Sequence, residues 1–409
     1  MATLADVARH AGVAPSTVSY VLSGKKQVSE QTRERVQRAI EALDYHPHAG
    51  ARALASSRTN VVALVLPLRG DGNVPVMMEV AVGVVTRARD YGYEVLLQSN
   101  DEGSAGIQRV TSTFRADAVI LTDVGMTDER IATISQTGIA AVLIGMPADP
   151  SGLDCVDLDF AAAGRLCVQH LAQLGHRTVA FIGEPDGVYR RRVGFAERTM
   201  RAVTEAAAAA GVDVVHRPCE GSYEAVAGTL ARILDERPNT TGLIVQNEAI
   251  IPPLMSLLRT AGRIVPEDVS IVALCPDNIA EQTAPRLTSV NIPAAELGTR
   301  AVDLLMRRMA DGRPGEVQLI PPSLTVRGST APAGHPRGLP RRKVRTRRIS
   351  RRRGLTHLEM DDCLDESTHL RTSPVDLAVK IIQNGSLLRD HRPLTLADGL
   401  PGGTRPRYD

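Results

Sequence analysis

Apolar residues recur at helical spacing in the N-terminal part of this 409-residue chain. In the first such stretch, Leu4, Val7 and Ala11 follow one another at three- and four-residue steps, which places them on one face of a helix. Thr3 precedes the stretch and can cap the helix with its side-chain oxygen. Gly12 follows it and can adopt the left-handed conformation that ends a helix. The pattern therefore predicts a first helix that begins near Leu4.

Two more helices are predicted directly downstream. Pro15 suits the first turn of a helix, where its missing N–H would have no partner, and Ser29 and Thr32 offer capping oxygens to a third helix. The apolar positions are Val18, Val21 and Leu22 in the second helix, and Val36, Ala39, Ile40 and Leu43 in the third. Together the three apolar stripes can close a miniature core. This layout is typical of a helix-turn-helix head.

The polar face of the second helix predicts contacts with DNA. In helix-turn-helix proteins the start of this helix meets base edges, while hydroxyls, lysines and backbone N–H groups hold phosphates. Pro15, Ser16 and Tyr20 are therefore the candidate base readers. Other hydroxyls and basic groups that could contact DNA are Thr3, Thr17, Ser19, Lys25, Lys26, Arg33, Arg35 and Arg52. Because short helix pairs also arise by chance, the motif alone leaves the DNA-binding interpretation open.

The same stretch closely resembles the lactose and galactose repressor family. The segments that carry the resemblance are Asp6-Val-Ala, Ala11-Gly-Val, Thr17-Val-Ser, Val21-Leu, Thr32-Arg-x-Arg-Val36, Tyr45-x-Pro47 and Ala51-Arg-x-Leu54-Ala55. It implies a DNA-binding domain at 1–47 and a hinge helix at 48–58 that folds when two subunits meet on an operator. Leu54 falls at the position where a leucine enters the minor groove and kinks the duplex, with ordinary packing as the alternative. His48 departs from the family's usual Asn.

From Thr59 onward, short apolar runs alternate with amphipathic stretches in an α/β rhythm. Runs of Val, Ile and Leu of this kind predict strands buried on both faces of a parallel sheet. The predicted strands are 61–66, 94–98, 118–121, 140–144, 178–182, 242–245 and 270–274, and the predicted helices are 80–91, 161–174, 195–210, 225–235 and 251–261. The region 59–330 is too long for one ordinary domain. We therefore expect two doubly wound lobes with a cleft between them.

This region resembles the same repressors. The matching segments are Leu174-Gly-His-Arg177, Arg191-x-x-Gly194-Phe195, Val265-Pro-Glu-Asp-Val-Ser270, Pro285-Arg-Leu-Thr-Ser-Val290 and Leu297-Gly298. The resemblance implies a bilobal core, like that of periplasmic binding proteins, which holds a small effector, with a carbohydrate ahead of other metabolites. It implies that Arg191 reaches into the cleft, where a guanidinium suits bidentate contact with hydroxyls or a carboxylate. The alternative is a solvated charge within the run 190–192.

The resemblance implies further effector-binding positions. Tyr223 matches an aromatic that can stack on an apolar ligand face, and Met77 and Asp159 match other positions beside the cleft. Cys275 stands where the family commonly has the first of two acidic residues, which binds effector hydroxyls. Because a thiol accepts hydrogen bonds poorly, either Asp277 substitutes for it or the effector differs in class. A buried or cleft-lining thiol is expected, since no pattern places a base beside Cys275.

Charge is distributed unevenly along the chain. Residues 1–58 carry eight Lys or Arg against five Asp or Glu, whereas 59–330 carries 24 against 32. A mildly acidic core suits a protein whose DNA contacts are concentrated at one end. The segment 331–409 lies beyond the resemblance, and its Arg-rich start at 337–353 predicts a disordered arm with nonspecific affinity for DNA. A read-through or a shifted reading frame is the competing explanation for this segment.

Other classes of function find little support in the sequence. It contains no Walker loop, nucleophile elbow, His-Glu-x-x-His motif or dinucleotide fingerprint, and a sugar-processing enzyme would need a paired acid and base that no pattern places. The cysteines Cys155, Cys167, Cys219, Cys275 and Cys363 lack the spacing of a zinc site or a disulfide framework. A transport receptor would need a secretory leader, and the sequence shows none. It also shows no apolar run long enough to span a membrane. We therefore expect a cytoplasmic, homodimeric regulator that acts as a repressor. It should bind double-stranded operator DNA and a small effector, and it should need no cofactor or metal.

Overall fold

The computed structural model describes residues 2–23, 28–45, 58–71, 74–99, 102–112 and 116–334. Several predictions fall outside these ranges. They concern Lys25, Lys26, His48, Arg52 and Leu54, nearly all of the predicted hinge helix at 48–58, and the segment 335–409. Ala331 and Ala333 still hydrogen-bond to the core, through Ser270 and Leu174, so the described fold continues slightly past residue 330.

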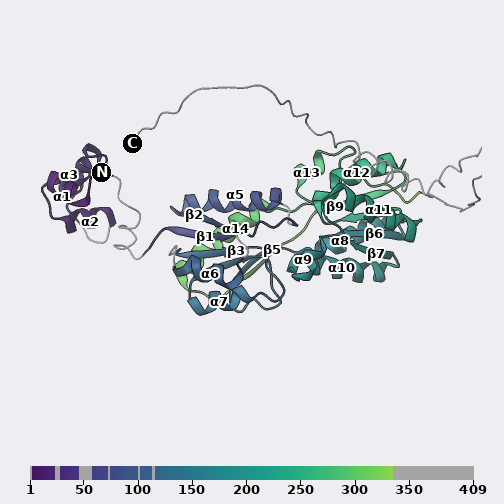
Figure 1. Cartoon of the computed structure of the whole chain (residues 1–409), viewed down its shortest axis with the longest axis horizontal. Coiled ribbons are helices and arrows are strands. Elements are labelled where there is room, and N and C mark those ends of the chain that lie inside the picture. The colour runs from purple at the N-terminus through teal and green to yellow at the C-terminus, as the bar shows by residue number, and fades with distance from the viewer. Residues whose placement is uncertain are drawn as a thin grey trace, which may run out of the picture. The chain divides into compact units, whose positions relative to one another are not determined.

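Three helices form the N-terminal head, as predicted: α1 (Leu4–Ala11), α2 (Pro15–Ser23) and α3 (Glu30–Ala42) (Figure 1). Thr3 caps α1, because its hydroxyl oxygen accepts the N–H of Asp6 while the Asp6 carboxylate accepts the N–H of Thr3. Gly12 ends α1 at φ 63°. The buried core of the head consists of Val7, Ala8, Ala11, Val18, Val36, Ala39 and Tyr45.

Arg35 has a structural role that the sequence pattern did not predict. Its guanidinium donates hydrogen bonds from α3 to the carbonyl oxygens of Ala11 and Gly12, the latter at 3.0 Å. A positive charge is favourable there, because the last carbonyls of a helix carry partial negative charge. Arg35 therefore ties α3 to the turn between α1 and α2, in addition to any charge that it offers to DNA.

Two six-stranded sheets build the core, one in each lobe. Lobe 1 has the order β11-β5-β4-β3-β1-β2 and is parallel throughout. Lobe 2 has the order β12-β10-β9-β8-β6-β7 and is parallel except for the pair β10–β12. The strands of lobe 1 are β1 (Val61–Val65), β2 (Glu94–Gln98), β3 (Ala118–Leu121), β4 (Ala140–Ile144), β5 (Asp154–Leu158) and β11 (Val317–Ile320). Those of lobe 2 are β6 (Thr178–Gly183), β7 (Asp213–Pro218), β8 (Gly242–Val245), β9 (Ser270–Leu274), β10 (Thr288–Val290) and β12 (Leu324–Thr325).

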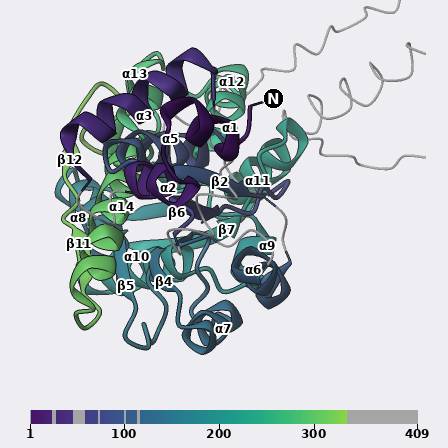
Figure 2. The same ribbon diagram turned by 90° about the vertical axis from the view of Figure 1, so that its left-hand side faces the viewer.

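Helices cover both faces of each sheet. In lobe 1, Val62 and Leu64 pack toward α5 and α14, while Ala63 and Val65 pack toward α6 and α7, and Figures 1 and 2 show α6 and α7 opposite α5. The helices of lobe 1 are α5 (Val74–Asp90), α6 (Gly103–Ser112), α7 (Glu129–Thr137) and α14 (Ala294–Asp311). Those of lobe 2 are α8 (Phe160–Gln173), α9 (Asp186–Arg190), α10 (Gly194–Ala210), α11 (Tyr223–Glu236), η1 (Glu248–Ile250), α12 (Ile251–Thr260) and α13 (Asp277–Glu281). The seven predicted strands and five predicted helices are confirmed.

Three short segments join the lobes: Asp159, residues 291–293 and residues 321–323. As a result, α14 and β11 return to lobe 1 after lobe 2 has been built, and β12 returns to lobe 2. Within the ranges described above, no helix is both long enough and apolar enough to cross a membrane.

Candidate functional site

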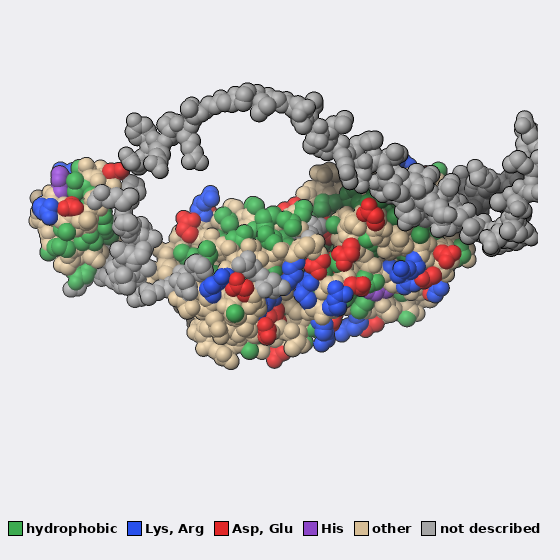
Figure 3. All heavy atoms as spheres, viewed as in Figure 1, with side chains coloured by type: hydrophobic (Ala, Val, Ile, Leu, Met, Phe, Trp, Pro, Cys, Tyr) green, Lys and Arg blue, Asp and Glu red, His purple; other side chains and the backbone are tan. Residues whose placement is uncertain are grey.

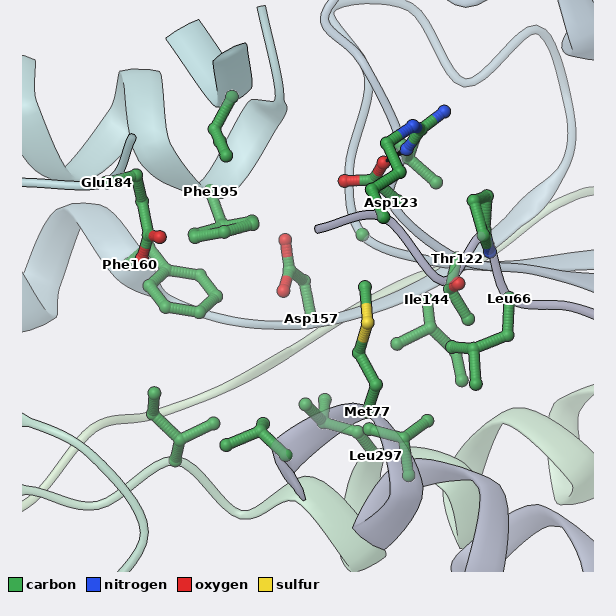
Figure 4. Close-up of a pocket in the computed structure, with 18 of the residues that line it drawn as sticks. Leu66, Met77, Thr122, Asp123, Ile144, Asp157, Phe160, Glu184, Phe195 and Leu297 are labelled. Atoms are coloured by element: carbon green, nitrogen blue, oxygen red, sulfur yellow. Dashed lines mark hydrogen bonds and ion pairs between the residues drawn. The ribbon is translucent and has the colours of Figure 1, made fainter. Parts of the chain in front are cut away.

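A cavity of about 160 Å³ lies between the two lobes. Several of its polar residues lie at or just beyond the carboxyl ends of parallel strands, where open α/β sheets bind ligands. The polar lining residues are Arg69, Asp71, Thr122, Asp123 and Asp157 from lobe 1, and Glu184, Arg191, Gln246 and Glu248 from lobe 2. Figure 4 shows Glu184 and Asp157 together with two phenyl rings at one end of the cavity, and Asp123 and Thr122 at the other.

The cavity also has an apolar surface. Phe160 and Phe195 stand with their ring centroids 5.3 Å apart, and Met77 projects toward the cavity from α5 (Figure 4). Other apolar lining residues include Leu66, Ile144, Ile292 and Leu297. The cavity therefore has both polar and apolar surfaces. They suit a ligand with hydroxyl or charged groups on one side and carbon–hydrogen groups on the other, because aromatic faces favour apolar or cationic groups.

An ion pair joins the lobes at the cavity. Arg191 follows α9 in lobe 2 and donates two hydrogen bonds to the Asp71 carboxylate of lobe 1, at 2.8 and 3.2 Å. Hydrogen bonding to Arg191 holds the pKa of Asp71 below its usual value. Within lobe 1, Arg69 forms an ion pair with Asp123. Both guanidinium groups that line the cavity are therefore already paired with carboxylates.

Backbone contacts also hold the lobes together beside this ion pair. The N–H of Met126 donates to the carbonyl of Arg192 at 2.8 Å, and the N–H of Gly194 donates to the carbonyl of Val124 at 2.9 Å. A Cβ on Gly194 would lie 2.5 Å from the carbonyl oxygen of Met146, so only glycine allows this approach. The two backbone hydrogen bonds therefore report directly on whether the lobes are in contact.

Arg130 fixes the loop that carries Asp123. This buried guanidinium donates to the carbonyls of Thr122 and Asp123 at 3.2 and 2.9 Å, and to the Asp128 carboxylate at 2.6 Å. Asp128 is equally buried, and hydrogen bonding to Arg130 lowers its pKa despite desolvation, which acts in the opposite direction. A buried and fully paired charge of this kind positions the loop because breaking the pair leaves an uncompensated charge.

Desolvation shifts three carboxyl groups at the cavity toward their protonated forms. Burial raises the pKa of Glu248 to about 7, and it raises that of Asp157 to about 7 against the opposing positive charge of Arg198. Glu184 has a pKa well above its ordinary value because of burial and the nearby Glu248 carboxyl. Gln246 is 2% exposed, and neither its amide nitrogen nor its amide oxygen has a hydrogen-bond partner. Buried polar atoms of this kind usually bind a ligand or an ordered water.

These carboxyls should make the core less stable as pH rises from 5 to 8. The ordinary pKa values are 4.5 for Glu248 and 3.8 for Asp157, both below the folded value of about 7. Between these values the folded chain keeps protons that the unfolded chain has lost, so the free energy of unfolding falls progressively as pH rises and levels off above about 7. We expect Glu248→Gln to raise the free energy of unfolding at pH 8 more than at pH 5, as measured by chemical denaturation. The exposed control Glu267→Gln should leave the pH dependence unchanged; if Glu248→Gln does so as well, Glu248 is ionised in the folded state.

The structure brings two of the predicted effector-binding residues, Met77 and Arg191, to the cavity. Asp159 instead caps α8, where its carboxylate accepts the N–H of Ala162 at 2.8 Å. Tyr223 is the first residue of α11 and is 37% exposed. Neither Asp159 nor Tyr223 lines this cavity, so it gives no support to the effector contacts predicted for them.

Cys275 and Asp277 also lie outside the cavity lining. Cys275 is 0% exposed within the apolar core of lobe 2, and burial raises the pKa of its thiol to about 12. Asp277 accepts a hydrogen bond from Arg327 at 2.6 Å, so its carboxylate is already engaged. Two other acidic residues, Glu184 and Glu248, line the cavity, and they follow β6 and β8.

The predicted DNA-contacting face of the head is accessible at the start of α2. Pro15 and Ser16 are exposed, while Thr17, Ser19 and Tyr20 are half-buried. Thr3 is exposed, and its hydroxyl also donates to the Asp6 carboxylate at 2.7 Å. The contacts of these residues with DNA stay predictions.

A helix-turn-helix head joined to a bilobal core with a ligand-sized cavity defines a DNA-binding regulator that responds to a small molecule. Residues 3–48 match the family described as bacterial regulatory proteins, lacI family, and residues 168–330 match a periplasmic binding protein-like domain. The HTH-type transcriptional regulator CelR of Thermobifida fusca is 30% identical over 333 residues, which cover 78% of this chain and 95% of CelR. The chain therefore belongs to the lacI family and is a DNA-binding transcriptional regulator.

Solved structures share this architecture. A complex of the transcriptional regulator CelR with cellobiose aligns over 80% of this chain and 100% of that one, with 28% identity and a TM-score of 0.58. The lac repressor dimer bound to operator and the anti-inducer ONPF aligns over 81% and 99% of the two chains, with a TM-score of 0.71. Its 23% identity supports the fold alone.

Proposed function

We propose that this regulator acts in the cytoplasm as a homodimeric repressor rather than as an enzyme, and that a small polar effector in the interlobe cavity changes its affinity for operator DNA. The observation that carries the proposal is the cavity itself, whose lining from both lobes includes the unpartnered amide of Gln246. A ligand that contacts both lobes binds one lobe arrangement more tightly than the other. If the two arrangements also differ in affinity for DNA, this difference gives a coupling free energy between the effector and the operator. The sign of the coupling depends on which arrangement binds DNA.

A carbohydrate fits the effector site best among common metabolites. Carboxyl, amide and guanidinium groups supply hydrogen-bonding partners for hydroxyls, and the rings of Phe160 and Phe195 supply a surface for the carbon–hydrogen face of a sugar. The cellobiose complex of CelR supports the same class of ligand.

The surface of lobe 1 supports self-association. Large apolar side chains are exposed on α5, on the edge strand β2 and in the turn between them, and Figure 3 shows hydrophobic side chains gathered over α5. The exposed residues are Val74, Val82, Val85, Tyr91 and Leu97. A contiguous exposed apolar surface often marks a protein–protein interface. A homodimer on this face would present two heads to a pseudo-palindromic operator.

Selection of bound genomic fragments tests the DNA-binding part of the proposal. Gel-shift measurements with the selected operator should show about tenfold weaker binding for Ser16→Ala or Tyr20→Ala, because each removes a candidate contact with a base edge. Affinity for unrelated DNA should change little. The matched control is Gln31→Ala at an exposed position of α3, which should bind the operator as the wild type does. Equal losses on operator and unrelated DNA would contradict base contacts from α2, and failure to select any sequence would contradict the whole proposal.

A further inference from the structure

We propose that the effector carries a positively charged group, such as a protonated amine on a carbohydrate, and that Glu184 and Glu248 bind this group. The inference rests on the proposed function, because it specifies the chemistry of the ligand in the same cavity. It does not depend on the sign of the coupling to DNA.

Most of the charged groups at the cavity are already compensated by charges of the protein itself. The two guanidinium groups in the lining are paired, Arg191 with Asp71 and Arg69 with Asp123. Asp157 lies within the electrostatic influence of Arg198, which donates to the carbonyl of Pro147 at 3.0 Å. The remaining carboxyls of the lining are Glu184 and Glu248.

Glu184 and Glu248 have acidic rather than basic neighbours. The charged groups that act most on Glu184 are Glu248 and Asp71, and the one that acts most on Glu248 is Glu79. Glu248 is buried and Glu184 is half-buried. Desolvated carboxyls in this setting must keep their protons or bind a cation, because negative charge without a partner is costly there. A cationic ligand group would therefore provide what the surrounding protein does not.

The groups that support Glu184 add no positive charge. The hydroxyl of Tyr189 accepts the N–H of Glu184 at 3.3 Å, and the same hydroxyl lies 3.2 Å from Nε2 of His216. A Cβ on Gly183 would lie 2.2 Å from this hydroxyl oxygen, so the turn after β6 is closely packed. Burial lowers the pKa of His216 to about 4, which leaves its imidazole neutral near pH 7. The turn thus positions Glu184 without compensating its charge.

The segment after β8 presents two polar side chains to the cavity. Gln246 and Glu248 both line the cavity, and both amide atoms of Gln246 lack partners. Asn247 between them turns into lobe 2, where its amide nitrogen donates to the carbonyl of Cys219 at 2.8 Å and its side-chain oxygen accepts the N–H of Ala249. Since Asn247 holds this segment, Gln246 and Glu248 face the cavity as a fixed pair. The unpartnered amide independently indicates that a polar ligand completes the site.

The aromatic rings favour the same kind of group. Figure 4 shows Phe160 and Phe195 at the same end of the cavity as Glu184. Phenyl faces attract a cation once water is excluded, and a hydrogen bond from an ammonium to a carboxylate is stronger than one from a neutral hydroxyl. A neutral sugar could use the rings and the amide, but the two carboxyls would then have to keep their protons.

Matched ligands can test the inference on the full-length chain. Glucosamine is compared with glucose and N-acetylglucosamine, and the amine, neutral and N-acetylated forms of galactose and of cellobiose-sized disaccharides are compared in the same way. Binding is measured by thermal shift and calorimetry at pH 7.5. We expect at least one amine to bind about tenfold or more tightly than both of its uncharged counterparts, because only the amine makes a charge-assisted contact.

Two variants assign the effect to the proposed residues. Glu184→Gln and Glu248→Gln should each weaken amine binding about tenfold while changing the binding of neutral sugars little. The exposed control Glu267→Gln should have no effect. Far-UV circular dichroism spectra that match the wild-type spectrum would show that both variants fold.

Three results would overturn the inference. They are the absence of binding by every amine, binding of a neutral sugar as tight as that of its amine, and amine binding that survives both glutamine substitutions. The second result would leave the proposed function intact, because a neutral effector would still occupy the cavity. The proposed function itself fails separately, if no operator is bound.

Discussion

Gly298→Ala should lower the free energy of unfolding of the core by about 3 kcal/mol, because it overpacks the contact between α14 and α5. A Cβ at Gly298 would lie 2.3 Å from the carbonyl oxygen of Val80 and 2.8 Å from the backbone nitrogen of Val84. These are backbone atoms, so the two helices must move apart to accept the methyl group. Gly83 faces the same contact, since a Cβ there would lie 2.2 Å from the carbonyl oxygen of Ala295.

Chemical denaturation of Gly298→Ala and of a matched variant, Gly228→Ala, measures this effect. Gly228 lies in α11, and a Cβ there would meet no atom within 4 Å. Alanine should therefore stabilise that helix by up to about 1 kcal/mol. Because α5 also carries Met77 to the cavity, Gly298→Ala should weaken effector binding as well. Equal stabilities for the two variants would show that α5 and α14 do not approach this closely.

Arg191→Ala should let the lobes separate more often. The substitution removes both hydrogen bonds to Asp71, and hydrogen bonds between charged groups are worth about 1.5–3 kcal/mol. The backbone N–H groups of Met126 and Gly194, which bond across the lobes, should then exchange with deuterium about tenfold faster or more. Amides in the interior of β8 and β9 should exchange at unchanged rates.

The same measurement on Asp71→Asn separates two roles for Arg191. If Arg191 mainly joins the lobes, Asp71→Asn accelerates exchange at Met126 and Gly194 and weakens effector binding, as Arg191→Ala does. If Arg191 is mainly an effector ligand, Asp71→Asn frees its guanidinium and strengthens effector binding. The control Arg201→Ala removes an exposed guanidinium whose ion pair lies within α10, so it should change neither property.

The sequence predicted strands where burial could be achieved with apolar side chains alone. It missed β5, because Asp154 and Asp157 interrupt the apolar run. Asp154 is nonetheless fully buried, since its carboxylate accepts hydrogen bonds from Arg308 at 3.2 Å and from the N–H of Glu316 at 2.8 Å. Those partners come from more than 150 positions away in the chain. The local sequence pattern cannot predict a strand whose buried carboxylate is stabilised by residues so far away in the chain.

The candidate site was predictable only in part, for a similar reason. The resemblance indicated Met77 and Arg191 correctly as residues near a cleft, but the partner of Arg191 is Asp71, 120 positions earlier. The acidic residues Glu184 and Glu248 have a signal in the sequence, since each follows a predicted strand closely. This signal alone does not identify the site, because the order of the strands decides which strand ends meet at the cavity.

The chain crosses between the two lobes three times, and this connectivity affects both its synthesis and the recombination of its gene. Lobe 1 needs α14 and β11, so its sheet is complete only at residue 320, and lobe 2 needs β12, so its sheet is complete only at residue 325. The head, in contrast, is one continuous stretch. A single genetic crossover can therefore replace the head and leave the cavity intact, whereas the exchange of one lobe needs several crossovers. Recognition of DNA can change in one step during evolution, but the two halves of the ligand site must change together.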